Sequence, residues 1–440
     1  MRYELGAALI LVVVAVAAAC AKPAKAPEGI LFKDDVAFLE AKTKVIVLGG
    51  PDGRAQVAVN PDLQGRVMTS TAAGPGGLSF GWINRELIAS GVNDPHMNAF
   101  GGEDRFWLGP EGGQFSIFFK KGDPFDLEHW FTPPPINEGA FDVASKGPDR
   151  IHFRKIMRLV NYSGTVFELE VNRGVRLLGA GDVAAIGVPV PGGVEMVAYA
   201  TTNAVANVGA NAWTKETGLV SIWILGMFNP SPATTIVIPF KAGPESELGP
   251  TVNDAYFGKV PADRLVVKAA EGVLFFSGDG KYRSKIGISP RRVKFFAGSY
   301  DAANKVLTLV RLTIPEGAAD YVNSMWEIQK DPYAGDVVNS YNDGPASPGA
   351  KPLGPFYELE TSSPAAALAP GGTLTHVHTT MHFQGPKKAL DAIARKTLGV
   401  GLAEISSALS RGTGGERSLR SGPAESRTTT QGRDSAKYPE

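Results

Sequence analysis

Two stretches near the C-terminal end of the chain carry side chains suited to proton transfer. Side chains two residues apart in an extended strand point to the same side. In residues 356–361, Glu358 and Glu360 therefore share a face. In residues 373–383, His376, His378 and His382 share a face, and they make up three of the six histidines in the chain. Carboxylates and imidazoles that lie close together can act as general base and general acid.

The spacing of the histidines leaves two interpretations open. His376 and His378 would lie about 7 Å apart along the strand, close enough to contact one small ligand or ion together. Alternatively, this is a polar sheet face whose histidines form local hydrogen bonds. Val377, Met381 and Phe383 lie on the opposite face and are expected to belong to the core. If the two strands pair, a glutamate can approach a histidine, but the register cannot be derived from the sequence.

A glycine-bracketed block at residues 98–113 is the second candidate. It holds Glu103, Asp104, Arg105 and Trp107 within five positions. Carboxylates and a guanidinium bind sugar hydroxyls, and an indole packs on the apolar side of a pyranose ring. The alternative is a tight loop with a local Arg–Asp pair and a tryptophan in the core.

A proline-rich stretch at residues 123–137 is the third candidate. His129 and Trp130 precede three consecutive prolines. Stiff loops that carry aromatic residues often line a cleft. A surface loop with one buried tryptophan fits the same pattern, and both interpretations stay open. We predict no metal site and no cofactor.

Composition limits the class of protein. The 440 residues include 44 Lys and Arg against 44 Asp and Glu, with 43% hydrophobic residues. This is a globular composition, and its zero net charge lacks the basic footprint of a nucleic-acid partner. Cys20 is the only cysteine, so no intramolecular disulfide can form.

The remaining chain is rich in glycine and proline, with 52 and 32 residues, which favours many short strands over long helices. No βαβ alternation is present, so we predict an all-β fold, a large sandwich of antiparallel sheets over residues 31–385. A helical segment is expected at 386–409, best defined at 386–398, and a disordered tail at 410–440. The expected strands are 44–48, 56–60, 114–119, 151–159, 166–177, 219–227, 234–240, 273–276, 305–314, 356–361 and 373–383.

The N-terminus has the pattern of an export signal. Arg2 precedes an apolar run that ends in three alanines before Cys20, and this run is too short for a comfortable transmembrane helix. Residues 17–20 resemble a bacterial lipobox, with alanine where leucine is typical. We expect a lipoprotein signal peptide at 1–20, lipidation of Cys20 and a tether at 21–30, which would anchor the protein in the bacterial cell envelope. Ordinary signal cleavage beside a chance cysteine is the alternative.

The C-terminal motifs resemble those of aldose 1-epimerases, the galactose mutarotases. The matching residues are Leu359-Glu360-Thr361, Pro364, Pro370-Gly371 and His378-Thr379-Thr380. The resemblance implies a β-supersandwich with a sugar-sized cleft and assigns Glu360 as the catalytic base. The block at 101–111 is similar to that of uncharacterised relatives, and the chain as a whole is similar to bacterial lipoproteins of unknown function. The central histidine that serves as the acid in mutarotases is missing, because Thr202-Asn203-Ala204 occupies the comparable place.

Three functions follow as expectations. The first is a lipid-anchored protein that binds a mono- or oligosaccharide through Arg105, Trp107, Trp130 and the Glu358/Glu360 face. The second is an epimerase with Glu360 as base and His376, His378 or His129 as acid. The third is a structural surface lipoprotein without a ligand. The first two differ in one geometric feature: catalysis needs Glu360 and a histidine within reach of the same bound atom.

Overall fold

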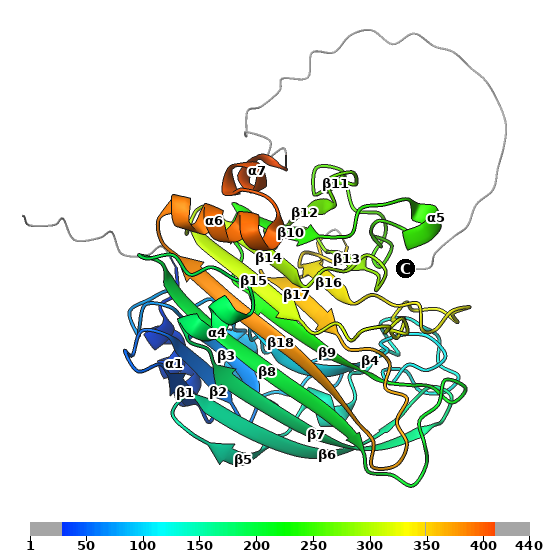
Figure 1. Cartoon of the computed structure of the whole chain (residues 1–440). Coiled ribbons are helices and arrows are strands. Elements are labelled where there is room, and N and C mark those ends of the chain that lie inside the picture. Colours follow the sequence, from blue (N-terminus) through cyan, green and yellow to red (C-terminus); the bar gives the residue numbers. More distant parts are fainter. Residues whose placement is uncertain (1–28, 348, 410–440) are drawn as a thin grey trace, which may run out of the picture. The chain divides into compact units, whose positions relative to one another are not determined.

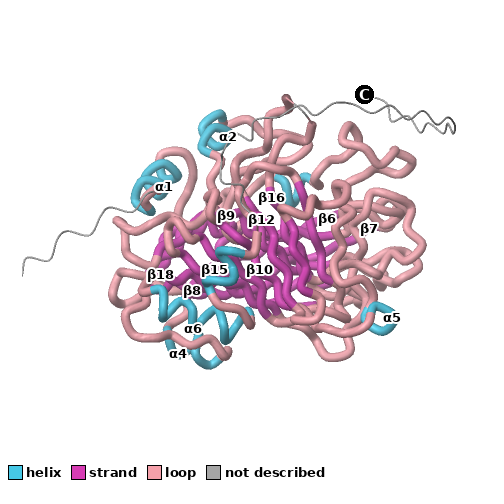
Figure 2. The backbone as a smooth tube through the Cα atoms, turned by 90° about the horizontal axis from the view of Figure 1, so that it is seen from above, coloured by secondary structure: helices cyan, strands magenta, loops and turns pink. Residues whose placement is uncertain are grey.

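The computed structural model describes residues 29–347 and 349–409, and it consists mainly of antiparallel β-sheets (Figure 1). Strands occupy the centre when the molecule is seen from above, and loops surround them (Figure 2). Every pairing between the named strands is antiparallel. The predicted all-β fold class is therefore confirmed.

The largest sheet has ten strands. In spatial order they are β11 (Leu265–Lys268), β12 (Val273–Ser277), β10 (Thr234–Pro239), β14 (Phe296–Asp301), β15 (Val306–Leu312), β18 (Thr373–Gln384), β8 (Glu195–Asn207), β7 (Val166–Leu177), β6 (Arg150–Val160) and β5 (Asp142–Lys146).

A five-stranded sheet packs against it, and a smaller third sheet lies beside both. The five strands are, in order, β13 (Ser284–Ile288), β16 (Val338–Asn342), β17 (Tyr357–Ser362), β9 (Ser221–Phe228) and β4 (Arg105–Gly109). The third sheet consists of β1 (Ile46–Gly49), β2 (Gln56–Asn60) and β3 (Arg66–Thr71). The helices are α1 (Phe32–Glu40), α2 (Arg85–Ser90), α3 (Pro134–Asn137), α4 (Ala180–Ala185), α5 (Glu245–Leu248), α6 (Lys387–Leu398) and α7 (Leu402–Ser407).

One hydrophobic core fills part of the space between the ten-stranded and five-stranded sheets. Leu359 of β17 and Ile286 of β13 are fully buried there against Ile236 and Val310 of the larger sheet. Because side chains alternate along a strand, Glu358 and Glu360 on either side of Leu359 point away from this core. The packing of β17 thus decides which way both glutamates face.

A second core covers the other side of the ten-stranded sheet. Met381 and Phe383 of β18 pack there against Leu390 and Ile393 of α6. The expected helix at 386–398 is confirmed as α6, and its apolar face explains why it folds back on the sheet. Met381 and Phe383 are core residues as predicted, whereas Val377 is only half-buried. Between His378 and Phe383, strand β18 is therefore buried on both faces, including the face that carries His378 and His382.

The expected strands are present within two residues of their predicted limits, except that the strand predicted at residues 114–119 is wrong. This stretch is a loop, although Ile117, Phe118 and Phe119 are buried. Their side chains fill an aromatic cluster instead of alternating across a sheet, since Phe118 contacts both Trp107 and Trp130. Helix α1, within the region expected to be β-sandwich, was not predicted.

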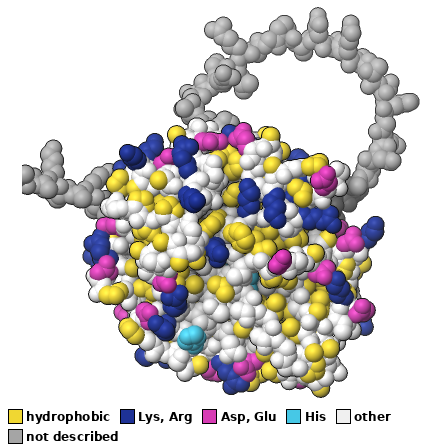
Figure 3. Space-filling view, in the orientation of Figure 1, with side chains coloured by type: hydrophobic (Ala, Val, Ile, Leu, Met, Phe, Trp, Pro, Cys, Tyr) yellow, Lys and Arg dark blue, Asp and Glu magenta, His cyan; other side chains and the backbone are white. Residues whose placement is uncertain are grey.

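The predicted signal peptide, Cys20, nearly all of the tether and the predicted tail lie outside the described residues. Within the described part, no helix has the length and apolar character needed to span a membrane. On the face seen in Figure 3, acidic and basic side chains are interspersed with apolar ones. This mixture agrees with the balanced charge of the sequence.

Candidate functional site

The candidate site lies on the outer face of the five-stranded sheet, the face turned away from the ten-stranded sheet. Residues directly opposite each other in an antiparallel pair point to the same side. Glu358 lies opposite Tyr341, and Tyr341 lies opposite Lys285. Glu360 lies opposite Leu225, and Leu225 lies opposite Arg105. The sheet therefore gathers two glutamates, an arginine and a lysine from three strands on its outer face.

Glu360 is held at one oxygen only. Its Oε2 accepts hydrogen bonds from Trp223 Nε1 at 2.8 Å and from Lys285 Nζ at 3.0 Å. Its Oε1 is buried and has no hydrogen-bond partner within residues 29–347 and 349–409. A buried carboxylate oxygen without a donor is costly, so such an atom marks a place where a ligand or water group is expected to bind.

Arg105 is the second anchor of the outer face. Its Nη2 donates to Glu358 Oε1 at 2.9 Å, and its guanidinium lies 4.3 Å from the ring centre of Trp107. Its Nε is also buried and has no hydrogen-bond partner in the described part of the chain. Arg105 and Glu360 therefore offer one unused donor and one unused acceptor on the same sheet face.

Burial and mutual charge shift the ionisation of this group. Burial raises the pKa of Glu358 to about 8, although the Arg105 guanidinium opposes this change and the Glu360 charge adds to it. Burial also lowers the pKa of Arg105. Burial alone would lower the pKa of Lys285, but the carboxylates of Glu360 and Glu111 raise it. Lys285 therefore remains a cation beside Glu360 at neutral pH.

An open cavity of about 340 Å³ adjoins this face. Glu111 and Tyr341 connect it with the charged group, and Trp130 and Trp326 line it with their rings 6.0 Å apart. Trp130 Nε1 is a further buried donor that lacks a partner among the described residues. The cavity has the aromatic walls and sparse polar groups of a small-molecule site.

The block at 103–107 is divided between two environments. Arg105 and Trp107 belong to the outer face, as described. Glu103 and Asp104 instead lie buried next to the ten-stranded sheet. Glu103 Oε2 accepts from Tyr199 and His382, both at 3.1 Å, and Asp104 pairs with Arg173 at 2.7 Å. Glu103 and Asp104 therefore do not belong to the outer face, and their expected contact with a ligand stays a prediction.

The histidines of β18 are on the other side of the five-stranded sheet from Glu360. His376 Nε2 and His378 Nδ1 both bond the hydroxyl of Thr361, at 2.8 and 2.9 Å. Thr361 follows Glu360 directly and so points into the sandwich. The expected acid–base pair of Glu360 with His376 or His378 is not formed. Burial lowers the pKa of His376 to about 3 and also lowers that of His378, so both are neutral.

The remaining predicted residues are distributed as follows. Trp130 lines the cavity, as expected of a cleft residue. His129 does not contribute to the outer face. Its Nδ1 bonds the carboxylate of Asp126 at 2.7 Å, and this hydrogen bond raises the pKa of the imidazole. His382 bonds Glu103 and Thr308 and does not reach the outer face. Within the described chain, no group of three or more His, Cys, Asp or Glu side chains is arranged to hold a metal ion.

Several residues of the site escaped the sequence analysis. Lys285 and Trp223 contact Glu360 directly, and Tyr256 borders a small cavity beside Lys285. None of them stands in a motif. Only the strand register brings Lys285, 75 residues away, to Glu360. Glu111 lies in the block that was singled out, and its acidic side chain between glycines and proline was a usable signal.

Comparisons with known proteins place these observations in a family. No curated protein matches the chain in sequence. Similar solved structures include a candidate aldose 1-epimerase from Escherichia coli, with 13% identity, a TM-score of 0.45 and coverage of 78% of this chain and 99% of that one. A galactose mutarotase-like protein from Lactobacillus casei has 10% identity, a TM-score of 0.43 and coverage of 78% and 100%. A galactose mutarotase related enzyme from Lactobacillus acidophilus has 9% identity, a TM-score of 0.42 and coverage of 78% and 98%. A family model matches residues 30–409, and the chain accordingly belongs to DUF6786, a family of unknown function.

Proposed function

We propose that the outer face of the five-stranded sheet binds a carbohydrate. The observation that carries this proposal is the pair of unused buried atoms, Glu360 Oε1 and Arg105 Nε. A sugar hydroxyl can donate to the first and another can accept from the second. Binding such a ligand would satisfy both atoms at once, and charge-assisted hydrogen bonds are the strong ones.

The aromatic residues at the cavity support the same ligand class. Trp130 and Trp326 present indole rings beside the charged group. A pyranose has one face of C–H groups that packs on such rings, while its rim of hydroxyls needs donors and acceptors. The outer face thus offers polar atoms on Glu360 and Arg105, and the cavity that adjoins it offers the indole rings. The motif Leu359-Glu360-Thr361, which resembles that of aldose 1-epimerases, points to the same class of ligand.

The test is saturation-transfer NMR on the full chain with a panel of hexoses, uronic acids and oligosaccharides. The chain should be held in an oligo-oxyethylene detergent, which carries no sugar headgroup. We expect transfer to at least one sugar, and its loss in Glu360→Gln. Thr361→Ser is the matched control. Thr361 follows Glu360 in the chain, but its hydroxyl faces the sandwich interior, so this variant should bind sugar as the unmodified chain does. Equal binding by Glu360→Gln, or no transfer to any sugar, would refute the proposal; the second result would favour a structural lipoprotein.

An epimerase is the second candidate, favoured by the free oxygen of Glu360. The resemblance to aldose 1-epimerases implies that this glutamate takes a proton from the anomeric hydroxyl. The groups near it are Lys285, Glu358 and Tyr256, since the histidines bond elsewhere. NMR of freshly dissolved α-anomers distinguishes the candidates. Accelerated equilibration that is lost in Glu360→Gln but kept in His378→Gln would establish catalysis without a histidine acid.

We further propose that lipidated Cys20 anchors the protein in a bacterial cell envelope. The support is the apolar run before the only cysteine of the chain. Labelled palmitate should enter the unmodified protein and not Cys20→Ser, and the variant should leave the membrane fraction. Membrane retention and labelling of Cys20→Ser would contradict this assignment. The balanced charge of the chain offers no support for a nucleic-acid partner.

A further inference from the structure

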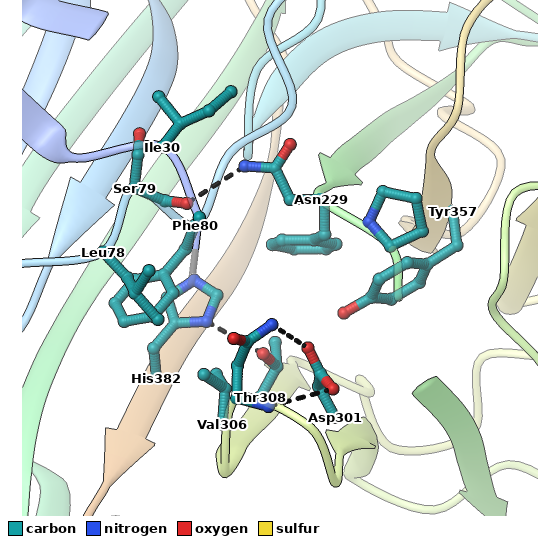
Figure 4. A pocket seen from close by; sticks show the side chains of 14 residues that line it. Ile30, Leu78, Ser79, Phe80, Asn229, Asp301, Val306, Thr308, Tyr357 and His382 are labelled. Carbon is teal, nitrogen blue, oxygen red and sulfur yellow. Dashed lines mark hydrogen bonds between the residues drawn. The ribbon is translucent and has the colours of Figure 1, made fainter. Parts of the chain in front are cut away.

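A second cavity of about 230 Å³ opens between the ten-stranded and five-stranded sheets. Thr308 of β15 and His382 of β18 line it from one sheet, and Tyr357 of β17 lines it from the other (Figure 4). Phe228 of β9 also lines it from the five-stranded sheet. None of its lining residues belongs to the cavity at the outer face. It is therefore separate from the proposed carbohydrate site.

Four rings form a continuous aromatic wall in this cavity. Phe80 stacks on His382 with ring centres 4.4 Å apart, and Phe228 meets His382 edge-on at 5.6 Å. Phe228 also lies 5.5 Å from Tyr357. The rest of the wall mixes apolar residues such as Leu78 and Val306 with polar ones such as Ser79 and Asn229. Aromatic faces carry partial negative charge and attract cations.

Asp301 adds a full negative charge to the same cavity. It is the only Asp or Glu among the lining residues, and no Lys or Arg lines the cavity. Its carboxylate accepts only from neutral donors, including Ser231 Oγ at 2.6 Å and Asn304 Nδ2 at 2.8 Å. Within residues 29–347 and 349–409 no cationic side chain is paired with it.

Negative charges lie close to the hydroxyl of Tyr357 in this cavity. The hydroxyl of Tyr357 and the carboxylate of Asp301 lie on the same side of the cavity (Figure 4). Burial raises the pKa of Tyr357, and the negative charges of Asp301 and Glu103 raise it further. Glu103 stands behind His382 and bonds it at 3.1 Å. An anionic ligand would find no Lys or Arg among the lining residues to offset its charge.

We propose that this cavity binds a small organic ammonium ion. An aromatic wall joined to an unpaired carboxylate is the arrangement that recognises quaternary and primary ammonium groups. The cavity is smaller than those that hold drug-sized ligands, which span roughly 300–1,000 Å³, so the ligand has few heavy atoms. A bare metal ion is disfavoured, because one carboxylate supplies too few oxygen ligands.

Choline and its uncharged analogue 3,3-dimethyl-1-butanol test the proposal. The two probes have the same shape and differ in charge, so titration calorimetry of the full chain in an oligo-oxyethylene detergent isolates the contribution of the charge. We expect choline to bind at least about tenfold more tightly than the analogue, and potassium chloride not to compete. Equal affinities, equal competition by potassium, or no binding at about 10 mM choline would overturn the proposal.

Asp301→Asn is the diagnostic variant. The amide oxygen keeps an acceptor for Ser231 and the local backbone, so the turn should fold. Affinity for choline should fall about tenfold while affinity for the analogue stays unchanged. Glu316→Gln, an exposed carboxylate outside the cavity, is the matched control and should leave choline binding unchanged. If Asp301→Asn does not fold, Phe80→Leu should weaken choline binding more than analogue binding, and equal losses would refute the proposal.

Discussion

Glu360 and Thr361 are neighbours in the chain, yet their side chains serve different parts of the molecule. Glu360 bonds Trp223 and Lys285 on the outer face, and Thr361 bonds two histidines inside the sandwich. The alternation of a strand therefore separates charged groups from neutral imidazoles by the thickness of one sheet. As a result, the pKa of Glu358 on the outer face is raised, whereas the pKa values of His376 and His378 inside the sandwich are lowered.

The first prediction concerns Glu358. Its pKa is about 8 in the folded chain and ordinarily 4.5, so between these values the folded chain holds a proton that the unfolded chain has released. The free energy of unfolding should therefore fall as the pH rises from 6.5 to 8. Denaturant titrations at several pH values measure this slope. Glu358→Gln should flatten it, and an unchanged slope in this variant would show that other groups are responsible.

The second prediction concerns His376 and has the opposite sign. Its pKa is about 3 in the folded chain and ordinarily 6.5, so below pH 6.5 the unfolded chain binds a proton that the folded chain excludes. The stability present above pH 6.5 should be lost on acidification, by about 2 kcal/mol between pH 7.5 and 5. His376→Gln should lose correspondingly less over this range. The same denaturant titrations measure this loss of stability. An equal loss in the unmodified protein and in His376→Gln would contradict the assignment to His376.

At the scale of elements, α6 acts as a cover for the ten-stranded sheet. Ile393 is fully buried against this sheet, whereas Lys388 on the same helix is exposed. Ile393→Ala should lower the free energy of unfolding by about 2–5 kcal/mol, because it removes buried methyl groups and leaves a cavity. Lys388→Ala is the control and should change stability by no more than about 0.5 kcal/mol. Similar effects of both substitutions would mean that α6 does not contribute to the core.

The elements also show what a sequence can reveal. Alternating patterns located β17, β18 and α6 to within a few residues, since periodicity is a local property. The apolar run at 114–119 has the composition of a strand, but its side chains fill an aromatic cluster in a loop. The partners of Glu360 could not be derived, because they depend on which strands pair and in which register. Lys285 reaches Glu360 only through β16, which had no expected counterpart.

At the scale of the whole molecule, Glu103 connects all three sheets. Its carboxylate accepts from Ser70 of the three-stranded sheet, and from Tyr199 and His382 of the ten-stranded sheet. Arg105, two residues later, begins β4 of the five-stranded sheet. The hydrogen bonds of Glu103 to the three-stranded and ten-stranded sheets thus help to place Arg105 in the five-stranded sheet.

Glu103→Gln should therefore destabilise the whole domain. The amide keeps one acceptor but brings an NH2 group to a position where every neighbour donates, which should cost about 1–3 kcal/mol. Denaturant titration against Glu128→Gln, an exposed loop substitution, measures the effect. Loss of stability in one cooperative transition is expected, and stability equal to that of the control would show that the bonds of Glu103 are dispensable.

The hydrogen bonds that converge on Glu103 also determine where each imidazole proton resides. Since the carboxylate only accepts, Tyr199 must donate to it and accept in turn from Thr380. Thr380 then accepts from His378 Nε2, and His378 Nδ1 accepts from Thr361, whose oxygen accepts from His376 Nε2. His382 donates its Nε2 proton to Glu103 directly. His376 and His378 are thereby locked in the Nε2–H tautomer, a state that nitrogen-15 chemical shifts report for each ring.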